Sequence, residues 1–254
     1  MHDLTGRTVL LTGASKGIGA ATAEALGAAG ANVVAHYGGD RAGAEAATAQ
    51  IPQERKLLLQ ADLADLGAVR AMWEEAVAWQ GRVDVLVNNA AVMLDSPLNG
   101  SDDEWDASWA RQLDVNVKGP AALLRAATRH HLEHAGGVIV TLSSWAAQRG
   151  AGNPDLIAYS GSKAAIKAAT QTIARAHAAD GVLAYVVAPG VVRTQMSEVS
   201  AQRTGGEEAL TASLTMKEWV PPSDLADLVT YLASGRCRHL TGATLDVNGA
   251  SYVR

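Results

Sequence analysis

The stretch Thr12-Gly13-Ala14-Ser15-Lys16-Gly17-Ile18-Gly19 decides the fold of this chain. The apolar run Thr8-Val9-Leu10-Leu11 precedes it, and residues 20–29, which are rich in strong helix formers, follow it. A strand, a tight glycine turn and a helix in this order form the context that a dinucleotide-binding loop requires. The sequence therefore predicts a phosphate-binding turn here, although a single glycine loop also occurs as an ordinary structural turn.

Three glycines of this loop have separate expected tasks. Gly13 permits the turn, Gly17 lets the backbone approach a pyrophosphate, and Gly19 lets the helix pack on the strand. The amide groups at the start of the helix then face the diphosphate. The spacing, Gly-x-x-x-Gly-x-Gly, is one residue longer than the common Gly-x-Gly-x-x-Gly form.

Short apolar runs alternate with helical patterns along the rest of the chain. The further strand candidates are residues 32–35, 56–60, 83–87, 138–142, 183–187 and 244–247. The helical stretches are residues 43–50, 66–79, 105–131, 157–179 and 223–233. Strands that are apolar on consecutive residues are buried on both faces, which indicates a parallel sheet flanked by helices on both faces. We therefore predict an α/β fold, a single doubly wound Rossmann domain over residues 1–254.

The composition argues against several classes of function. The net charge is −5 and no basic stripe is present, which argues against nucleic-acid binding. The single cysteine, Cys237, excludes an intramolecular disulfide framework and a cysteine cluster for zinc, and we predict no metal site. No signal peptide is recognisable and no apolar run reaches membrane length. These features predict a cytoplasmic protein that does not bind a membrane.

A tyrosine and a lysine, Tyr159 and Lys163, lie four residues apart in a predicted helix. This spacing places the phenol and the ammonium on one helix face, as neighbours. A nearby cation favours the phenolate, so we expect the pKa of Tyr159 to be lowered from about 10 towards working pH. The pair would then act as a general acid and base. The same spacing is also common on solvated helix surfaces.

Over essentially its full length the chain resembles the short-chain dehydrogenase/reductase family. The matching motifs are the glycine loop, Asp62-Leu63, Asn88-Asn89-Ala90-Ala91, Asn116, Ser143-Ser144, Tyr159-x-x-x-Lys163 and Pro189-Gly190-x-x-x-Thr194. Each falls at the carboxyl end of a predicted strand or in the helix after it, where ligands bind in such sheets. The resemblance implies hydride transfer between a nicotinamide and a carbonyl or alcohol, in either direction.

The resemblance implies four catalytic residues. Tyr159 exchanges a proton with the substrate oxygen, while Lys163 lowers the tyrosine pKa and holds the nicotinamide ribose. Ser144 hydrogen-bonds the substrate carbonyl. Ser143 competes for this role, and Ser144 is preferred because of its spacing to a following glycine. Asn116 would hold a water that connects Lys163 to solvent, and the alternative is an asparagine that kinks its helix.

The resemblance also assigns residues to the cofactor. They are Gly13, Ser15, Lys16, Gly17, Ile18, Gly19, Tyr37, Arg41, Asp62, Leu63, Asn89, Ala90, Tyr159, Lys163, Pro189, Gly190, Val192 and Thr194. Enzymes that prefer NAD carry an acid at the end of the second strand, which accepts from the ribose 2′-hydroxyl. Here that position carries Tyr37, and Lys16 and Arg41 offer cations to a 2′-phosphate. NADP(H) is therefore favoured, and Asp40 keeps NAD(H) as the alternative.

By resemblance the nearest members are 3-oxoacyl-carrier-protein reductases and related ketone and sugar reductases. Docking of an acidic carrier protein needs a basic patch, which in that pathway lies before the fifth and sixth strands. Here those places carry His130, His131 and His134, and then Asp180. We interpret the histidines as a solvated helix end, with a weakly cationic or metal-like cluster as the alternative.

We therefore expect an NADPH-dependent reductase of a small free carbonyl or alcohol substrate. A 3-oxoacyl-carrier-protein reductase and an NAD-dependent sugar or polyol dehydrogenase are the alternatives. A non-catalytic dinucleotide-sensing protein is a remote alternative, because such relatives typically lose the tyrosine or the lysine that this chain keeps.

Two features depart from the family pattern. Ala91 replaces the glycine that usually ends the Asn-Asn-Ala-Gly motif, and its methyl group would lie on the nicotinamide side. The loop between Ser144 and Tyr159 is longer than is common in the family. Its additional residues, within 151–155, would lie against the mouth of the substrate pocket.

Residues 197–222 form the one long stretch without a clear pattern, and such segments are often lids. In the family this part of the chain covers the substrate, and Gly205-Gly206 would be the hinge. The helices at 105–131 and 157–179 pair with a second subunit in the family, and the C-terminal tail meets a third. We therefore expect a homotetramer.

Overall fold

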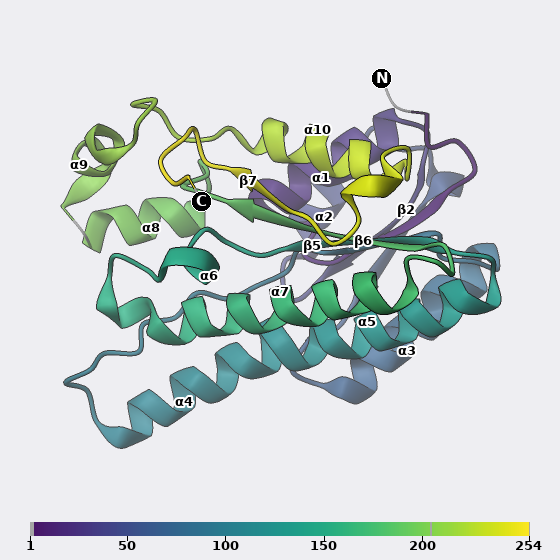
Figure 1. Ribbon diagram of the computed structural model, residues 1–254. Coiled ribbons are helices and arrows are strands. Elements are labelled where there is room, and N and C mark those ends of the chain that lie inside the picture. Colours follow the sequence, from purple (N-terminus) through teal and green to yellow (C-terminus); the bar gives the residue numbers. More distant parts are fainter. Residues whose placement is uncertain (1–2, 204, 254) are drawn as a thin grey trace.

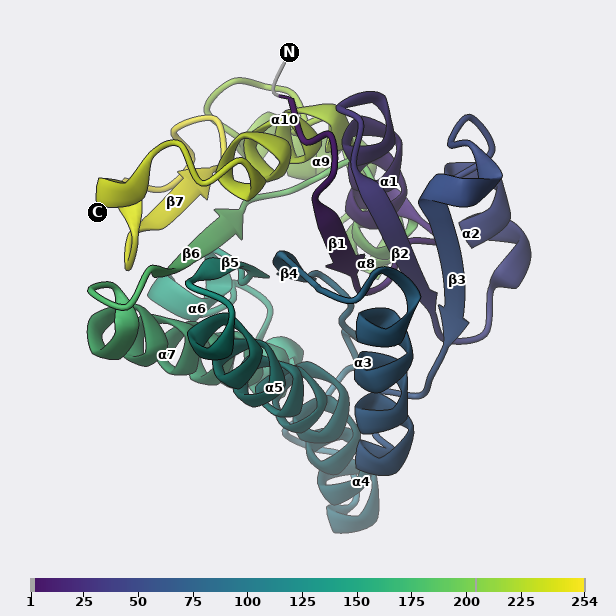
Figure 2. The same cartoon turned by 90° about the vertical axis from the view of Figure 1, so that its right-hand side faces the viewer.

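Seven parallel strands form one sheet in this chain, of which a computed structural model describes residues 3–203 and 205–253. Figure 1 shows the sheet between its helices, and Figure 2 shows all seven strands, whose order is β3-β2-β1-β4-β5-β6-β7. The strands are β1 (Thr8–Leu11), β2 (Asn32–Tyr37), β3 (Lys56–Gln60), β4 (Val85–Asn88), β5 (Gly137–Leu142), β6 (Val182–Pro189) and β7 (Thr244–Val247). The order runs outward in opposite directions from β1 and β4, so the topological switch point lies between them.

Helices cover both faces of the sheet, as Figure 2 shows. On one face α1 (Gly17–Ala28) packs against α10 (Pro222–Ala233), with α2 (Arg41–Ala47) beside α1. On the other face lie α3 (Leu66–Gln80), α5 (Gly119–Glu133) and α7 (Ile157–His177), with α4 (Asp102–Leu113) below them. The short helices are α6 (Ala146–Arg149), α8 (Gln195–Arg203), α9 (Gly206–Ser213), and 3-10 turns at Gln53–Arg55, Pro154–Leu156 and Arg238–Leu240.

The strands supply two hydrophobic cores, because successive side chains of a strand point to opposite faces. Val9 and Leu11 belong to the core under α1 and α10, together with Leu26. Leu10 belongs to the core on the opposite face, together with Leu123. All five side chains are buried. The doubly wound sheet with helices on both faces confirms the predicted fold class.

The helix predicted over residues 105–131 is interrupted. It consists of α4, a π-helical turn at Asp114–Lys118, and α5. The interruption lies where Asn116 turns its side chain towards the backbone of residue 92. A local sequence pattern predicts a helix on both sides of this point, but the widened turn depends on a partner that is distant in the chain.

The segment 197–222, predicted to lack a regular pattern, is largely helical. It contains most of α8 and all of α9, although Thr204 lies outside the described residues. Ala201, Leu214 and Trp219 are buried together in a small core, and the Trp219 indole donates to Thr211 Oγ1 over 2.7 Å. These helices are short and polar, so the packing around Trp219 organises them rather than an apolar stripe along each helix.

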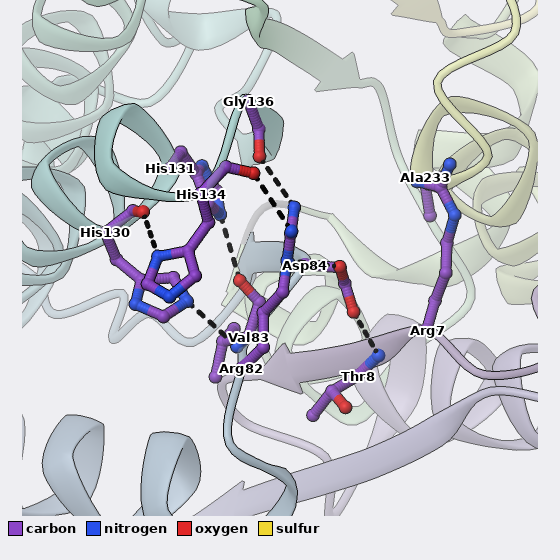
Figure 3. A network of polar contacts seen from close by, with 10 residues as sticks. All are labelled: Arg7, Thr8, Arg82, Val83, Asp84, His130, His131, His134, Gly136 and Ala233. Atoms are coloured by element: carbon purple, nitrogen blue, oxygen red, sulfur yellow. Dashed lines mark hydrogen bonds and ion pairs between the residues drawn. The ribbon is translucent and has the colours of Figure 1, made fainter.

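The three histidines near the end of α5 are not a solvated helix end. Figure 3 shows them against the start of β4, where His130 Nε2 accepts from Val83 N over 3.2 Å. His131 Nε2 lies 3.2 Å from the Val83 carbonyl, and its ring is buried. His134 stacks on His130 with ring centroids 4.1 Å apart. The rings therefore close the amino-terminal end of the sheet, and within the described residues no group of His, Cys, Asp or Glu has the arrangement to hold a metal.

Candidate active site

A cleft of about 580 Å³ opens at the carboxyl ends of β1, β4, β5 and β6. This volume is in the range of small-molecule sites. Of the predicted site residues, the cleft is lined by Gly13, Ser15, Lys16, Gly17, Ile18, Gly19, Asn89, Ala90, Ser144, Tyr159, Lys163, Pro189, Gly190, Val192 and Thr194. The glycine loop and the tyrosine–lysine pair, at least 140 residues apart in the sequence, thus face one cavity.

The glycine loop is shaped so that side chains would not fit. Gly13 and Gly17 have φ angles of +71° and +53°, which glycine adopts without strain. A Cβ at Gly17 would lie 2.8 Å from Thr194 Cγ2, and a Cβ at Gly19 would collide with the Gly13 carbonyl oxygen. The loop and the start of α1 therefore present bare backbone to the cleft. Such a cradle suits a diphosphate at the helix N-terminus.

Two side chains that are distant in the sequence hold this loop. Asn89 Nδ2 donates to Thr12 O over 2.9 Å and to Gly13 O over 3.1 Å. His36 Nδ1 accepts from Gly13 N over 3.1 Å, and its Nε2 lies 3.0 Å from Ala61 O. Burial lowers the pKa of His36, which keeps the ring neutral and able to accept. Sequence reasoning missed His36, because a histidine inside an apolar strand carries no local signal of this contact.

The residues at the end of β2 differ from the prediction. Tyr37 is buried, and neither Tyr37 nor Arg41 is among the described residues that line the cleft. Arg41 instead pairs with Glu45 over 2.8 Å. Asp40 lines the cleft, caps α2 and lies 3.2 Å from Lys16 Nζ. The reason is the turn after β2, which carries Asp40 rather than Tyr37 to the glycine loop.

Asp62 and Leu63 follow β3 and do not line the cleft within the described part of the chain. Leu63 is buried in the core under α3 and α5. Asp62 Oδ2 accepts from Arg111 over 3.1 Å, and the Ala64 amide followed by Arg111 lowers the pKa of its carboxyl. Asp62 therefore lies near the ring of His36, and Leu63 belongs to the core rather than to the cavity wall.

The two serines after β5 point in different directions. Ser143 Oγ donates to the backbone carbonyl of Lys163 over 2.9 Å, so this hydroxyl is occupied by α7. Ser144 Oγ accepts from Ala146 N over 3.1 Å and also hydrogen-bonds Tyr159. Both serines line the cleft, and Ser144 is the one that contacts the tyrosine hydroxyl.

The pKa expected for Tyr159 is wrong for this chain by itself. Burial raises the pKa of Tyr159 to about 12, and the hydrogen bond to Ser144 acts in the opposite direction. Burial lowers the pKa of Lys163 to about 8, and its Nζ donates to Leu142 O over 2.8 Å. The helical spacing placed both residues at the cleft. It did not show that the ammonium would turn to a backbone carbonyl of β5 and that the phenol would be desolvated.

The side chain of Asn116 makes three hydrogen bonds within the protein. Its Oδ1 accepts from Val92 N over 2.8 Å, and its Nδ2 donates to Val92 O over 2.8 Å and to Ser162 Oγ over 3.1 Å. It is buried behind the cleft wall, inside the π-helical turn. The side chain thus connects the π-helical turn to the segment after β4 and to α7, and the role of Asn116 in holding a water stays a prediction.

The cleft residues Met93 and Asp95 were not predicted, whereas Asn153 belongs to the loop expected at the substrate mouth, and Met196 and Val199 lie at the start of the expected lid. Met93 and Asp95 follow β4, Asn153 lies in the longer loop before α7, and Met196 and Val199 come from α8. Their positions after strands or next to family motifs were visible in the sequence, but not the direction of their side chains. Asn153 shows that the longer loop does reach the cleft.

Ala91, which replaces the glycine of the Asn-Asn-Ala-Gly pattern, also lines the cleft. Ala91 is partly buried there, so its methyl group adds to the cavity wall. The cavity thus combines a bare backbone cradle at one end with a hydroxyl pair and a buried ammonium near the other. This combination can bind a phosphate-bearing ligand and transfer a proton at the same time.

A model of the family described as enoyl-(acyl carrier protein) reductase matches residues 13–250. With the relatives below, this shows that the chain belongs to the short-chain dehydrogenase/reductase family. It is an oxidoreductase that acts on CH–OH or C=O groups with NAD(P).

Three relatives illustrate the similarity. The 3-oxoacyl-(acyl-carrier-protein) reductase of Staphylococcus aureus is 33% identical over 250 residues, covering 97% of this chain and 98% of the relative. A short-chain dehydrogenase from Burkholderia cenocepacia in complex with NADP has a TM-score of 0.87 at 31% identity, covering 98% and 99% of the two chains. A 3-ketoacyl-(acyl-carrier-protein) reductase from Brucella melitensis complexed with NADH has a TM-score of 0.87 at 28% identity, covering 99% and 100%.

In the described part of the chain, no helix has both the length and the apolar character needed to cross a membrane.

Proposed function

We propose that this protein reduces a small ketone to a secondary alcohol with NADPH. The observation that carries the proposal is the hydrogen-bonded pair of Ser144 and Tyr159, which lies in the same cleft as the buried Lys163 and the glycine cradle. The phenol of Tyr159 is protonated at neutral pH, as a proton donor to a carbonyl oxygen must be.

Three side chains of the cleft have separate roles in this reaction. When bound, a nicotinamide supplies the hydride. Ser144 hydrogen-bonds the substrate oxygen and holds it beside Tyr159, and Tyr159 donates its phenolic proton to that oxygen as negative charge develops there. Lys163, protonated near neutral pH with its pKa of about 8, stabilises the phenolate that remains.

The cradle fits a dinucleotide because its backbone amides lie at the start of α1 and side chains there would collide. NADP(H) is the favoured form and NAD(H) the alternative. Lys16 is 62% exposed along its side chain and pairs with Asp40 at the surface. Such a pair is worth about 0–1 kcal/mol, so Lys16 can turn to a 2′-phosphate at little cost. Asp40 is the group that would accept from a 2′-hydroxyl instead.

Substitution of the proton donor tests the proposed chemistry. Tyr159→Phe should keep the affinity for NADPH, measured by tryptophan fluorescence, and should lose turnover by ~10²–10⁴-fold, the usual worth of acid–base catalysis. Tyr231→Phe, which removes a hydroxyl on α10 outside the cleft, is the matched control and should keep its turnover. A Tyr159→Phe enzyme with more than about a tenth of wild-type turnover would contradict the proposal.

A second candidate substrate is a 3-oxoacyl group on a carrier protein. The relative from Staphylococcus aureus is named a 3-oxoacyl-(acyl-carrier-protein) reductase, which favours this substrate. Against it, His130 is buried in the sheet end, and Asp180 pairs with His177 over 3.0 Å at the second expected basic place. Turnover of acetoacetyl-carrier protein compared with its small thioester analogue separates the two. A large preference for the protein-bound form would favour the carrier.

Assembly is also proposed from the family. The alanine-rich helix α7 and the adjoining α4 offer a face that suits a second subunit, and Ile157 at the start of α7 is 43% exposed. We propose a homotetramer, and light scattering that gives the mass of one chain would contradict it. Arg254, at the end of the tail assigned to a third subunit, lies outside the described residues. The cytoplasmic location stays a prediction from sequence.

A further inference from the structure

A ladder of side-chain hydrogen bonds joins the helix face before α5 to the segment that follows β4. Asn116 exchanges two bonds with the backbone of Val92, as described above. Gln112 repeats this pattern one turn earlier: its Oε1 accepts from Leu94 N over 3.3 Å, and its Nε2 donates to Leu94 O over 3.2 Å. The side chain of Gln112 is fully buried.

A third set of contacts in this ladder lies one more turn towards the start of α4. Ser108 Oγ lies 2.8 Å from Ser96 Oγ, and Gln112 Nε2 donates to both hydroxyls, over 3.1 Å and 3.4 Å. Ser96 N also donates to Asp155 O over 2.7 Å, which ties the segment to the loop before α7. All three hydroxyl and amide side chains of this set are buried.

The ladder forms because the bonded residues of the helix and those of the segment are spaced at nearly the same distance. Residues 108, 112 and 116 are four apart, which is about 6 Å along a helix. Their partners 96, 94 and 92 are two apart, which is about 6.7 Å along an extended chain. The helix face therefore takes the place of a neighbouring strand for residues 92–96, which belong to no strand of the sheet.

This arrangement decides which side chains of the segment face the cleft. In an extended chain, successive side chains point to opposite sides. Ala91, Met93 and Asp95 line the cleft, whereas Val92 and Leu94 are not among its described lining residues. The residues that the ladder holds thus alternate with those that face the cavity.

From this alternation we propose, on the basis of the proposed function, that Gln112 is a positioning residue that sets Met93 and Asp95 as the specificity wall of the substrate site. Gln112 touches no reacting group, and it acts by holding Leu94 and Ser96. The wall presents a thioether and a carboxylate to the substrate. The Asp95 carboxylate repels anions near it, so it disfavours ketones whose remainder is anionic.

Exchange of the glutamine for glutamate tests the positioning role. Gln112→Glu replaces a donor by an acceptor opposite Leu94 O and the two serine hydroxyls, while the shape of the side chain is kept. Loss of such a buried bond is worth at least about fivefold in an equilibrium constant. We expect the KM for methyl acetoacetate to rise by that factor or more, with the Kd for NADPH within about twofold of wild type.

A matched control uses a second glutamine that bonds to backbone. Gln171 Nε2 donates to Gly242 O over 3.1 Å on the far side of α7, and Gln171 is not among the described cleft residues. Gln171→Glu should leave the KM unchanged. Hydrogen exchange gives a second readout. Gln112→Glu keeps an acceptor for the Leu94 amide but loses the donor to Leu94 O, so the segment should open more often and the Leu94 amide should exchange faster. Gln171→Glu should leave the exchange of this amide unchanged.

Substitution of the carboxylate tests the charge preference. Methyl acetoacetate and acetoacetate have the same reacting ketone and differ in charge. Wild type should have a higher kcat/KM for the ester than for the acid. Asp95→Asn should reduce the ratio of these two values by a factor on the order of ten. An unchanged ratio in Asp95→Asn would overturn the specificity assignment.

The outcomes separate this inference from the function on which it rests. An unchanged KM in Gln112→Glu, with or without a change in exchange at Leu94, overturns the positioning role in catalysis. A wild-type protein that reduces no ketone with either nicotinamide cofactor refutes the proposed function instead. In that case the exchange of the Leu94 amide alone decides whether Gln112 positions the segment.

Discussion

Acidification should destabilise this protein through His131. The ring is fully buried, and its Nδ1 has no hydrogen-bond partner among the described residues. Its Nε2 faces the Val83 carbonyl, so a second proton would have to enter at the unpartnered Nδ1. Burial, followed by the charges of His130 and Arg82, lowers the pKa of His131 to about 4, although Asp84 acts in the opposite direction.

The sign and the size of this change in the free energy of unfolding follow from the linkage between proton binding and folding. An unfolded histidine has a pKa near 6.5, so between pH 6.5 and about pH 4 the unfolded chain binds the proton and the folded chain does not. Stability is therefore lost as the pH falls through this window. Between pH 7 and pH 5 the loss is about 2 kcal/mol. With an m value of about 3 kcal/mol/M, the urea midpoint falls by about 0.7 M.

Urea unfolding at the two pH values, followed by circular dichroism, measures this change. His131→Gln keeps a donor for the Val83 carbonyl but does not titrate, so it should lose the part of the pH dependence that His131 contributes. His36 and His130, whose pKa values burial also lowers, should keep their parts. His177→Gln changes a histidine at an exposed ion pair and should behave as wild type. Asp62 and Asp40, whose pKa values are lowered, titrate below this window. A His131→Gln variant with the full wild-type loss would refute the reasoning.

Three further predictions concern the cleft. Gly19→Ala should abolish NADPH binding in a fluorescence titration, because its Cβ collides with the Gly13 carbonyl; unchanged affinity would mean that the cradle opens easily. Asp40→Ser frees Lys16 from its ion pair, so it should raise the affinity for NADPH about fivefold. The affinity for NADH should stay equal or fall. Equal changes for both cofactors would argue against a contact between Lys16 and the 2′-phosphate. We propose that 197–222 is a lid, so its amides should gain protection from hydrogen exchange only with cofactor and substrate together, and equal protection in the free protein would make it a fixed element.

Much of the fold followed from short-range patterns. The glycine loop between an apolar run and a helix predicted β1, the turn and α1, because a strand–turn–helix unit is encoded by neighbouring residues. The apolar strands likewise predicted a parallel sheet, because burial on both faces leaves no room for polar alternation. The positions of Tyr159 and Lys163 on one helix face followed from helical geometry alone.

Other features depended on contacts between distant parts of the chain. The sequence alone determined that His130 and His131 lie near a helix end, but only the packing of α5 on β4 buries them. In the same way, the turn after β2 brings Asp40 to Lys16, and the face of α4 aligns Gln112 with Leu94. Hydrogen-bond partners, burial and pKa values all depend on which distant surfaces meet. Local patterns specify elements, and the meeting of those elements in the tertiary structure decides the chemistry of each side chain.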